Sequence, residues 1–281
     1  MERRKFGTTG LVASALGMGC SRLGSFLSVS SPKEAVATVR LAVERGISYF
    51  DTADIYAQGD SERLLGTALG RDRHRVLLAT KAGRRFSQRA RFAARIKTPI
   101  KFAMRLVPSL RAGARRTRSE HISLEFNPNY LTAALEHSLK RLRTDWVDVF
   151  MLHAPPPEIL ADEDLFHQLS RVIKQGKARF LGVSVADVAH VGLAARLPGV
   201  RAIQLPIGRP HRAAIAALLP ELASLGIAAV GREVFAGVDP VIDRAAFKTA
   251  LRESLEYPQV SVVLVGISSR EHLEANLASF A

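Results

Sequence analysis

Residues 146–184 read WVDVFML (146–152), EDLFHQLSRVIKQ (163–175) and RFLGVS (179–184), joined by short connections. The first and third stretches are mostly apolar, with many β-branched or aromatic residues, as in strands buried on both faces. In the second stretch apolar residues recur every three or four positions, which indicates a helix with one buried side. A buried strand, a helix and a second buried strand in succession predict a parallel sheet.

The same alternation continues along the chain. Strand candidates occupy residues 15–19, 47–51, 75–80, 146–152, 179–184, 200–205, 227–231 and 260–265. Helical patterns occupy residues 32–45, 61–69, 128–142, 163–175, 186–196, 210–224, 240–255 and 269–279. Eight such units in 281 residues predict an α/β fold, a closed (β/α)8 TIM barrel, and we expect residues 1–281 to form a single domain. An open doubly wound sheet is the alternative, but the glycines of residues 16–24 do not form its G-x-G-x-x-G turn.

Local signals mark where some elements begin. A capping side chain before a proline is typical of the first turn of a helix. Three such pairs occur, at Ser31-Pro32, Asn127-Pro128 and Asp239-Pro240. Near the amino terminus, residues 5–7 and 11–13 flank the turn sequence Thr8-Thr-Gly10. They predict an N-terminal β-hairpin, which we expect to cap the bottom of the barrel.

The composition is that of a globular protein, with 47% hydrophobic and 23% charged residues. No apolar run reaches the ~18 residues that a membrane-spanning helix needs. The start, MERRKFG, is not followed by the apolar stretch of a secretory signal. The single cysteine, Cys20, cannot form an internal disulfide, which fits a reducing compartment. We therefore expect a cytoplasmic protein.

The basic charge of the chain is concentrated in one segment. The third and fourth strand candidates start 71 residues apart, whereas the other intervals are 21–33 residues. This spacing predicts a basic insertion of about 40 residues, 84–120, between strand 3 and strand 4. Residues 84–118 hold twelve Lys or Arg and no Asp or Glu, and subtracting these charges from +14 leaves +2 for the rest. The net charge therefore describes the insertion, and we expect no nucleic-acid partner.

Three interpretations of residues 84–118 remain open. The segment is a mobile solvated lid, a lid that recruits an anionic or bulky apolar substrate, or a surface that contacts an anionic membrane or nucleic acid. Apolar residues recur near helical spacing between its basic residues, but Pro99 and Pro108 interrupt any helix. No aromatic pair suited to base stacking is present in it, which disfavours nucleic acid.

Ionisable side chains lie at the carboxyl ends of the predicted strands, where barrels of this type carry their active sites. Asp51, Lys81 and His153 end or directly follow the second, third and fourth strands, and Tyr56 follows Asp51 by five residues. A free phenol has a pKa near ~10, and an ammonium held in place by a carboxylate lowers that value. The four residues thus indicate a general acid that protonates a carbonyl oxygen.

Reduction of a carbonyl group also needs a source of hydride. The sequence has neither an H-E-x-x-H motif nor a two-cysteine zinc site, and a nicotinamide cofactor is the simplest source. A metal-dependent barrel hydrolase that uses Asp51, Asp54 and His153 is an alternative hypothesis. It predicts a bound metal ion and loss of function with a chelator.

Three blocks of the sequence resemble the aldo-keto reductase family. Phe50-Asp-Thr-Ala-Asp-Ile-Tyr56 is similar to the segment around the catalytic Asp and Tyr of the family. Ala79-Thr-Lys81-Ala-Gly83 is similar to the strand that carries the catalytic Lys, and the segment from Ser138 to His153 is similar to the one that ends in the catalytic His. The resemblance covers nearly the whole chain outside residues 84–120.

This resemblance implies NAD(P)H-dependent reduction of an aldehyde or ketone to the alcohol, with a small-molecule carbonyl compound as the substrate. Tyr56 would be the proton donor and Lys81 its pKa partner. Asp51 would pair with Lys81. His153 would orient the substrate carbonyl, and a share in the proton transfer is the alternative role left open for it. A cofactor-binding sensor or regulatory subunit with slow turnover is the alternative.

The resemblance also implies where the cofactor binds, extended across the barrel mouth. The nicotinamide carboxamide would contact Ser184 and Gln204, and the loop at 232–237 would straddle the pyrophosphate. The implied cofactor-binding residues are Ser184, Gln204, Arg232, Phe235, Gly237, Gly266, Ser268, His272 and Asn276. The sequence departs from the family pattern at Val185, where asparagine is usual, and at His272, where arginine is common. We expect NADPH, with NADH as the alternative.

Overall fold

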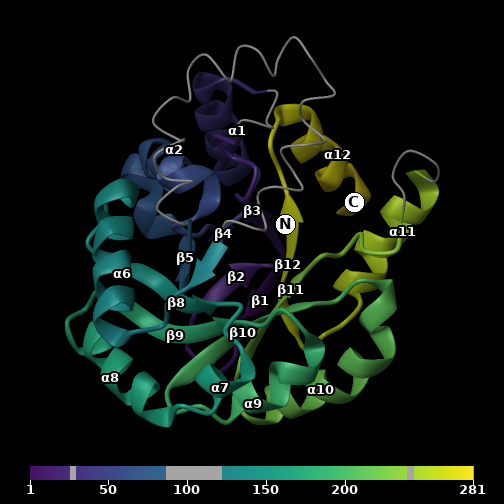
Figure 1. Cartoon of the computed structure of the whole chain (residues 1–281). Helices are drawn as coiled ribbons and strands as arrows, with labels where there is room; N and C mark the ends of the chain where they lie inside the picture. The colour runs from purple at the N-terminus through teal and green to yellow at the C-terminus, as the bar shows by residue number, and fades with distance from the viewer. Residues whose placement is uncertain (26–29, 87–121, 239–243, 281) are drawn as a thin grey trace.

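Parallel strands form the centre of the molecule (Figure 1). The computed structural model describes residues 1–25, 30–86, 122–238 and 244–280. Within these residues eight parallel strands close a barrel in the order β10-β11-β12-β3-β4-β5-β8-β9. They are β3 Leu16–Gly19, β4 Tyr49–Asp51, β5 Leu77–Ala82, β8 Val147–His153, β9 Ala178–Ser184, β10 Val200–Pro206, β11 Ala228–Arg232 and β12 Val260–Gly266. The predicted TIM barrel is confirmed, and each predicted strand agrees with an observed one to within two residues at either end.

Helices surround this barrel (Figure 1). They are α1 Pro32–Glu44, α2 Asp60–Leu69, α6 Pro128–Leu142, α7 Pro157–Leu160, α8 Glu163–Lys174, α9 Val191–Ala195, α10 Arg212–Ser224, α11 Arg244–Leu255 and α12 Arg270–Phe280. Short 3-10 helices are η1 Tyr56–Gly59, η2 Gly70–Arg75, η4 Val188–His190 and η5 Arg209–His211. The helix predicted over 186–196 is shorter than expected. The Asp187 side chain accepts a hydrogen bond from the Ala189 amide, so the first turn begins two residues later, as η4.

Two of the predicted helix starts are capped as expected. The Ser31 hydroxyl accepts from the Glu34 amide, and the Glu34 carboxylate accepts from the Ser31 amide, a capping box at the start of α1. At the start of α6 the Asn127 side chain accepts from the Asn129 amide at 2.9 Å. The third pair, Asp239-Pro240, lies outside the described residues.

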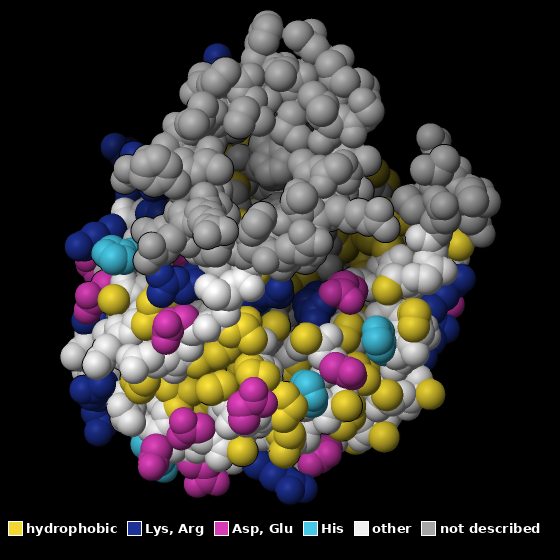
Figure 2. Space-filling model, in the orientation of Figure 1, with side chains coloured by type: hydrophobic (Ala, Val, Ile, Leu, Met, Phe, Trp, Pro, Cys, Tyr) yellow, Lys and Arg dark blue, Asp and Glu magenta, His cyan; other side chains and the backbone are white. Residues whose placement is uncertain are grey.

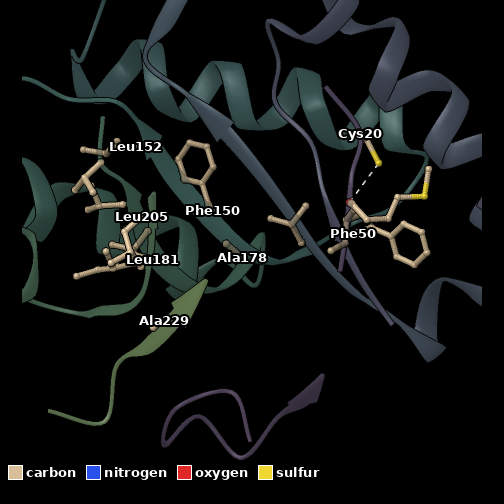
Figure 3. Close-up of a cluster of buried hydrophobic side chains, with 14 of the residues drawn as sticks. Cys20, Phe50, Phe150, Leu152, Ala178, Leu181, Leu205 and Ala229 are labelled. Atoms are coloured by element: carbon tan, nitrogen blue, oxygen red, sulfur yellow. Dashed lines mark hydrogen bonds between the residues drawn. The ribbon is translucent and has the colours of Figure 1, made fainter. Parts of the chain in front are cut away.

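Side chains on each strand alternate between two apolar cores, because successive residues of a strand face opposite ways. Phe150 and Leu152 of β8 lie in the larger core, between the strands and the helices (Figure 3). Val149 and Met151 of the same strand belong to the inner core, inside the barrel. Gly17 of β3 faces this lumen, where an added Cβ would lie 2.6 Å from Val262. The lumen is therefore filled by side chains at the level of these residues.

The amino-terminal hairpin closes one end of the barrel. It pairs β1 Arg3–Lys5 with β2 Val12–Ser14, antiparallel, as the turn sequence predicts. The Phe6 ring stacks on the Tyr49 ring of the inner core at a centroid distance of 5.5 Å. Arg4 donates to the backbone carbonyls of Leu255 and Val260, which precede or begin β12. The hairpin thus lies at the amino ends of the barrel strands.

A second small sheet, which the sequence analysis did not predict, stands at the opposite end. β6 Arg84–Phe86 follows β5 directly and pairs antiparallel with β7 Ile122–Leu124. Residues 87–121, which make up most of the predicted basic insertion, lie outside the described residues. On the face shown in Figure 2, basic and acidic side chains are interspersed over the described surface. This agrees with a barrel that is close to neutral.

Among the helices that the structure describes, none is both long and apolar enough to cross a bilayer.

The hairpin is expected to contribute to stability mainly through Phe6, which is fully buried. We predict that Phe6→Ala lowers the free energy of unfolding by about 3–5 kcal/mol, because it leaves a cavity against Tyr49. Urea denaturation measures this change. Val12→Ala in the same hairpin is the control, because Val12 is 43% exposed, and it should change stability by less than about 0.5 kcal/mol. If the two substitutions lowered the free energy of unfolding equally, Phe6 would not be the residue through which the hairpin closes the barrel.

Candidate active site

The alternation of side chains brings Asp51, Lys81 and His153 into the barrel mouth. Each stands two positions beyond a residue of the inner core and so faces the same way. The pairs are Tyr49 with Asp51, Ala79 with Lys81, and Met151 with His153. The structure therefore brings together the three ionisable residues that the strand ends predicted.

A buried ion pair occupies the base of this mouth. The Lys81 ammonium donates to both carboxylate oxygens of Asp51, at 2.6 and 2.7 Å, and to the Thr52 carbonyl at 2.8 Å. The Gln204 amide donates to the same carboxylate at 2.9 Å, and the Ser184 hydroxyl donates to Gln204 at 2.7 Å. Burial alone would lower the pKa of Lys81, but Asp51 and then Tyr56 outweigh it, so the pKa of Lys81 is raised. Lys81 is therefore a fixed cation.

Tyr56 lies beside this cation, at the start of η1. The Lys81 ammonium is 5.1 Å from the centroid of the Tyr56 ring. The sequence analysis expected the ammonium to lower the pKa of the phenol below its ordinary value. In the structure burial is the larger influence and Lys81 only partly offsets it, so the pKa of Tyr56 is raised. The phenol therefore holds its proton at neutral pH and is available as a proton donor.

His153 is in edge contact with the Tyr56 ring, with ring centroids 5.8 Å apart and planes at 88°. Burial is the main cause that holds the pKa of His153 well below its usual range, followed by the positive charges of Lys81 and Arg84. The imidazole is therefore neutral at physiological pH. Its buried Nδ1 has no hydrogen-bond partner among the described residues. A neutral imidazole has one N–H that can donate a hydrogen bond to a ligand, but it lacks the second proton that an imidazolium could transfer.

A cavity of about 760 Å³ opens above these groups. Of the predicted site residues, those that line it are Asp51, Tyr56, His153, Ser184, Gln204, Arg232 and Gly266. Among the further lining residues that the sequence analysis did not assign to the site are Gly19, Ser21, Arg22 and Arg84. Reading the carboxyl end of the first barrel strand, as was done for the other strands, would have identified the first three. Arg84 was instead counted with the insertion.

The other predicted cofactor residues, Phe235, Gly237, Ser268, His272 and Asn276, are not part of the described lining of this cavity. Arg232 pairs with Glu233 and donates to the Val185 carbonyl at 2.6 Å. Phe235 stacks on Phe247 at a centroid distance of 3.6 Å, and Gly237 has a φ of +79°. The described residues after β11 are thus held by the contacts of Arg232 and by the packing of Phe235.

At the carboxyl end of β12, the remaining residues form a second group. The Ser268 hydroxyl lies 3.1 Å from His272 Nδ1, and Asn276 donates to the His272 carbonyl at 2.7 Å. The side-chain oxygen of Asn276 is buried, and no described residue donates to it. This acceptor is therefore available to a ligand group that carries an N–H donor.

The alternative metal site would require Asp51, Asp54 and His153 to converge. In the part of the chain that the structure describes, no three His, Cys, Asp or Glu side chains are grouped as metal ligands. The Asp51 carboxylate bonds to Lys81 and Gln204 instead. Burial and the neighbouring Glu62 raise the pKa of Asp54 to about 7.

Comparison with known proteins places this geometry in context. The profile of the Aldo/keto reductase family matches residues 15–237. Uncharacterized oxidoreductase YqkF of Bacillus subtilis (strain 168) is 31% identical over 186 residues, which cover 66% of this chain and 49% of that protein. Probable aldo-keto reductase 1 of Glycine max is 26% identical over 240 residues, which cover 83% of this chain and 60% of that protein. The matches thus span about half to three fifths of the length of these curated relatives.

A solved structure is also similar in fold. The aldo-keto reductase AKR11C1 from Bacillus halodurans, in its holo form, superimposes with a TM-score of 0.75 at 24% sequence identity. The match covers 100% of this chain and 91% of that one. At this level of identity the similarity concerns the fold.

The buried ion pair is expected to act as a unit. We predict that Lys81→Met destabilises the protein by about 3–5 kcal/mol, because it leaves Asp51 buried without its cation. In urea denaturation, the double variant Asp51→Asn with Lys81→Met should lose less free energy of unfolding than the two single variants lose in sum. Lys177→Met is the control, since the pair Lys177–Glu136 is partly exposed, and it should cost less than about 1 kcal/mol. If the losses of free energy in the two single variants add up to the loss in the double variant, Asp51 and Lys81 are not coupled.

Proposed function

The chain belongs to the aldo/keto reductase family, and from this premise we propose that it is an NAD(P)H-dependent oxidoreductase that reduces an aldehyde or ketone to the alcohol. The observation that carries the proposal is the buried Asp51–Lys81 pair set beneath the ring of Tyr56. A fixed ammonium at this place stabilises the phenolate that remains after Tyr56 gives up its proton.

The described residues supply the acid part of this reaction. Tyr56, protonated at rest, donates its proton to the carbonyl oxygen as that oxygen gains negative charge. Asp51 keeps Lys81 charged and in position, since it accepts two of the hydrogen bonds of the ammonium. His153, neutral and in contact with Tyr56, donates a hydrogen bond that orients the carbonyl group. This division of roles assigns proton transfer to Tyr56 and positioning to His153.

The residues around the cavity fit a nicotinamide cofactor, which supplies the hydride when it is bound. The Gln204 amide and the Ser184 hydroxyl are buried at the cavity wall and can bond the carboxamide of the nicotinamide. Arg232 is placed to bond phosphate oxygens, with Phe235 and Gly237 shaping the loop that follows it. Gly266, Ser268, His272 and Asn276 would hold the adenosine end, where the oxygen of Asn276 suits the amino group of adenine.

Replacement of the proposed acid is the direct test of the reaction. We predict that Tyr56→Phe lowers kcat for aldehyde reduction by at least about 100-fold, because it removes only the transferable proton. Cofactor affinity, measured by calorimetry, should stay close to that of the original protein. If Tyr56→Phe retains most of its turnover, the acid is another group and the proposed role of Tyr56 is wrong.

The proposed preference for NADPH can be measured by titrating NADPH and NADH into the protein by calorimetry. Ser268 and His272 stand at the start of α12, where backbone N–H groups and the helix dipole favour a 2′-phosphate. We predict that His272→Ala weakens NADPH binding by about fivefold, which corresponds to roughly 1 kcal/mol, and leaves NADH binding nearly unchanged. Equal affinities of the original protein for both cofactors would contradict the preference.

A further inference from the structure

One cation of the cavity, Arg84, has an unusual position. It begins β6, three residues after Lys81, and the chain turns between them at Gly83, whose φ is +114°. A Cβ at position 83 would lie 2.2 Å from the Phe126 ring, so both the backbone angle and the space require glycine. This turn carries Arg84 to the wall of the cavity that Tyr56 and His153 also line.

Arg84 differs from its neighbour Arg85 in its partners. Arg85 forms an ion pair with Glu125 at 3.8 Å and lies over the Tyr130 ring at 5.5 Å. The Nε of Arg84, by contrast, is buried and has no hydrogen-bond acceptor among the described residues. Adjacent residues of a strand face opposite ways. β6 therefore presents Arg85, which has partners, outside the cavity and Arg84, for which the described residues supply no ion-pair partner, at the cavity wall.

The other charged groups of the lining are largely balanced. Asp51 is paired with Lys81, and Glu233 is paired with Arg232. Arg22, an exposed residue after β3, is the other cation of the described lining for which no carboxylate partner is found. The described wall of the cavity therefore has an excess of positive charge, and Arg84 contributes to it in the same cavity that Tyr56 and His153 line.

Arg84 is half-buried, and its buried Nε has no acceptor among the described residues. A buried donor without an acceptor is costly, and a ligand anion that accepts from it removes that cost. The planar fork of arginine matches the two oxygens of a carboxylate. Building on the proposed function, we propose that the substrate is a carbonyl compound that also bears a carboxylate, an oxo acid, and that Arg84 binds this carboxylate while Tyr56 and His153 hold the carbonyl oxygen. Arg84 is then a specificity-determining residue.

The test compares an acid with a neutral analogue of the same shape. The probes are 4-oxobutanoate and its methyl ester, together with the five- and six-carbon homologues of each. The homologues vary the distance between the carbonyl group and the carboxylate, so the series finds the spacing that fits the site. We expect a higher kcat/KM for at least one acid than for its ester. Arg84→Met should reduce that preference by about 10- to 100-fold, chiefly through KM, and Arg84→Lys should reduce it less. Arg85→Met is the matched control and should leave the preference unchanged.

Two results would overturn the proposal while the proposed function stands: reduction of every ester as efficiently as its acid, or an acid preference that survives Arg84→Met. If no acid and no ester is reduced with either cofactor, the proposed function fails for this class of compound, and a binding measurement then decides the anion site separately. In that measurement 4-hydroxybutanoate is titrated calorimetrically into the original protein and both Met variants. Binding that is lost only in Arg84→Met supports the site, and absent or equal binding in all three overturns it.

Discussion

The ion pair between Asp51 and Lys81 is the interaction on which the site depends. Either charge alone would be costly in an interior of low dielectric constant, but the two together are stable there. The carboxylate also accepts from Gln204, which accepts in turn from Ser184. One chain of polar contacts thus joins β4, β5, β9 and β10 across the lumen. The position of the ammonium beneath Tyr56 is set by the barrel strands and not by a loop.

Burial, together with the charges of the site, determines the protonation of the neighbouring groups. Burial is the main cause that raises the pKa of Tyr56. Lys81 lowers this pKa, and the negative charge of Asp51 opposes part of that influence. His153, further along the mouth, is affected by burial and by cations, among them Arg84 and Arg232. The result is a protonated phenol next to an uncharged imidazole. Two groups that both bind protons in water are therefore separated into a proton donor and a neutral hydrogen-bonding group.

Much of this arrangement could be predicted from the sequence because it is encoded locally. Buried strands, capping residues and strand ends are read from neighbouring residues, and they place Asp51, Lys81 and His153 at one mouth. The pairing of β6 with β7 could not be predicted in this way, since it joins Phe86 to Ile122 and no local period relates them. Arg84 was therefore assigned to the basic insertion. The pKa of Tyr56 was also misjudged, because it depends on burial and on the distances among three charges, which only the folded chain defines.

The closed end of the barrel has a consequence for the renewal of the proposed acid. Phe6 covers Tyr49 at the amino ends of the strands, and the inner core fills the lumen below the ion pair. In the described part of the chain, the lumen is thus filled at the amino ends of the strands, and the cavity lies at their carboxyl ends. In the proposed reaction, Tyr56 recovers its proton from solvent at the same end of the barrel where the alcohol leaves. Proton uptake and product release would therefore share one end of the barrel.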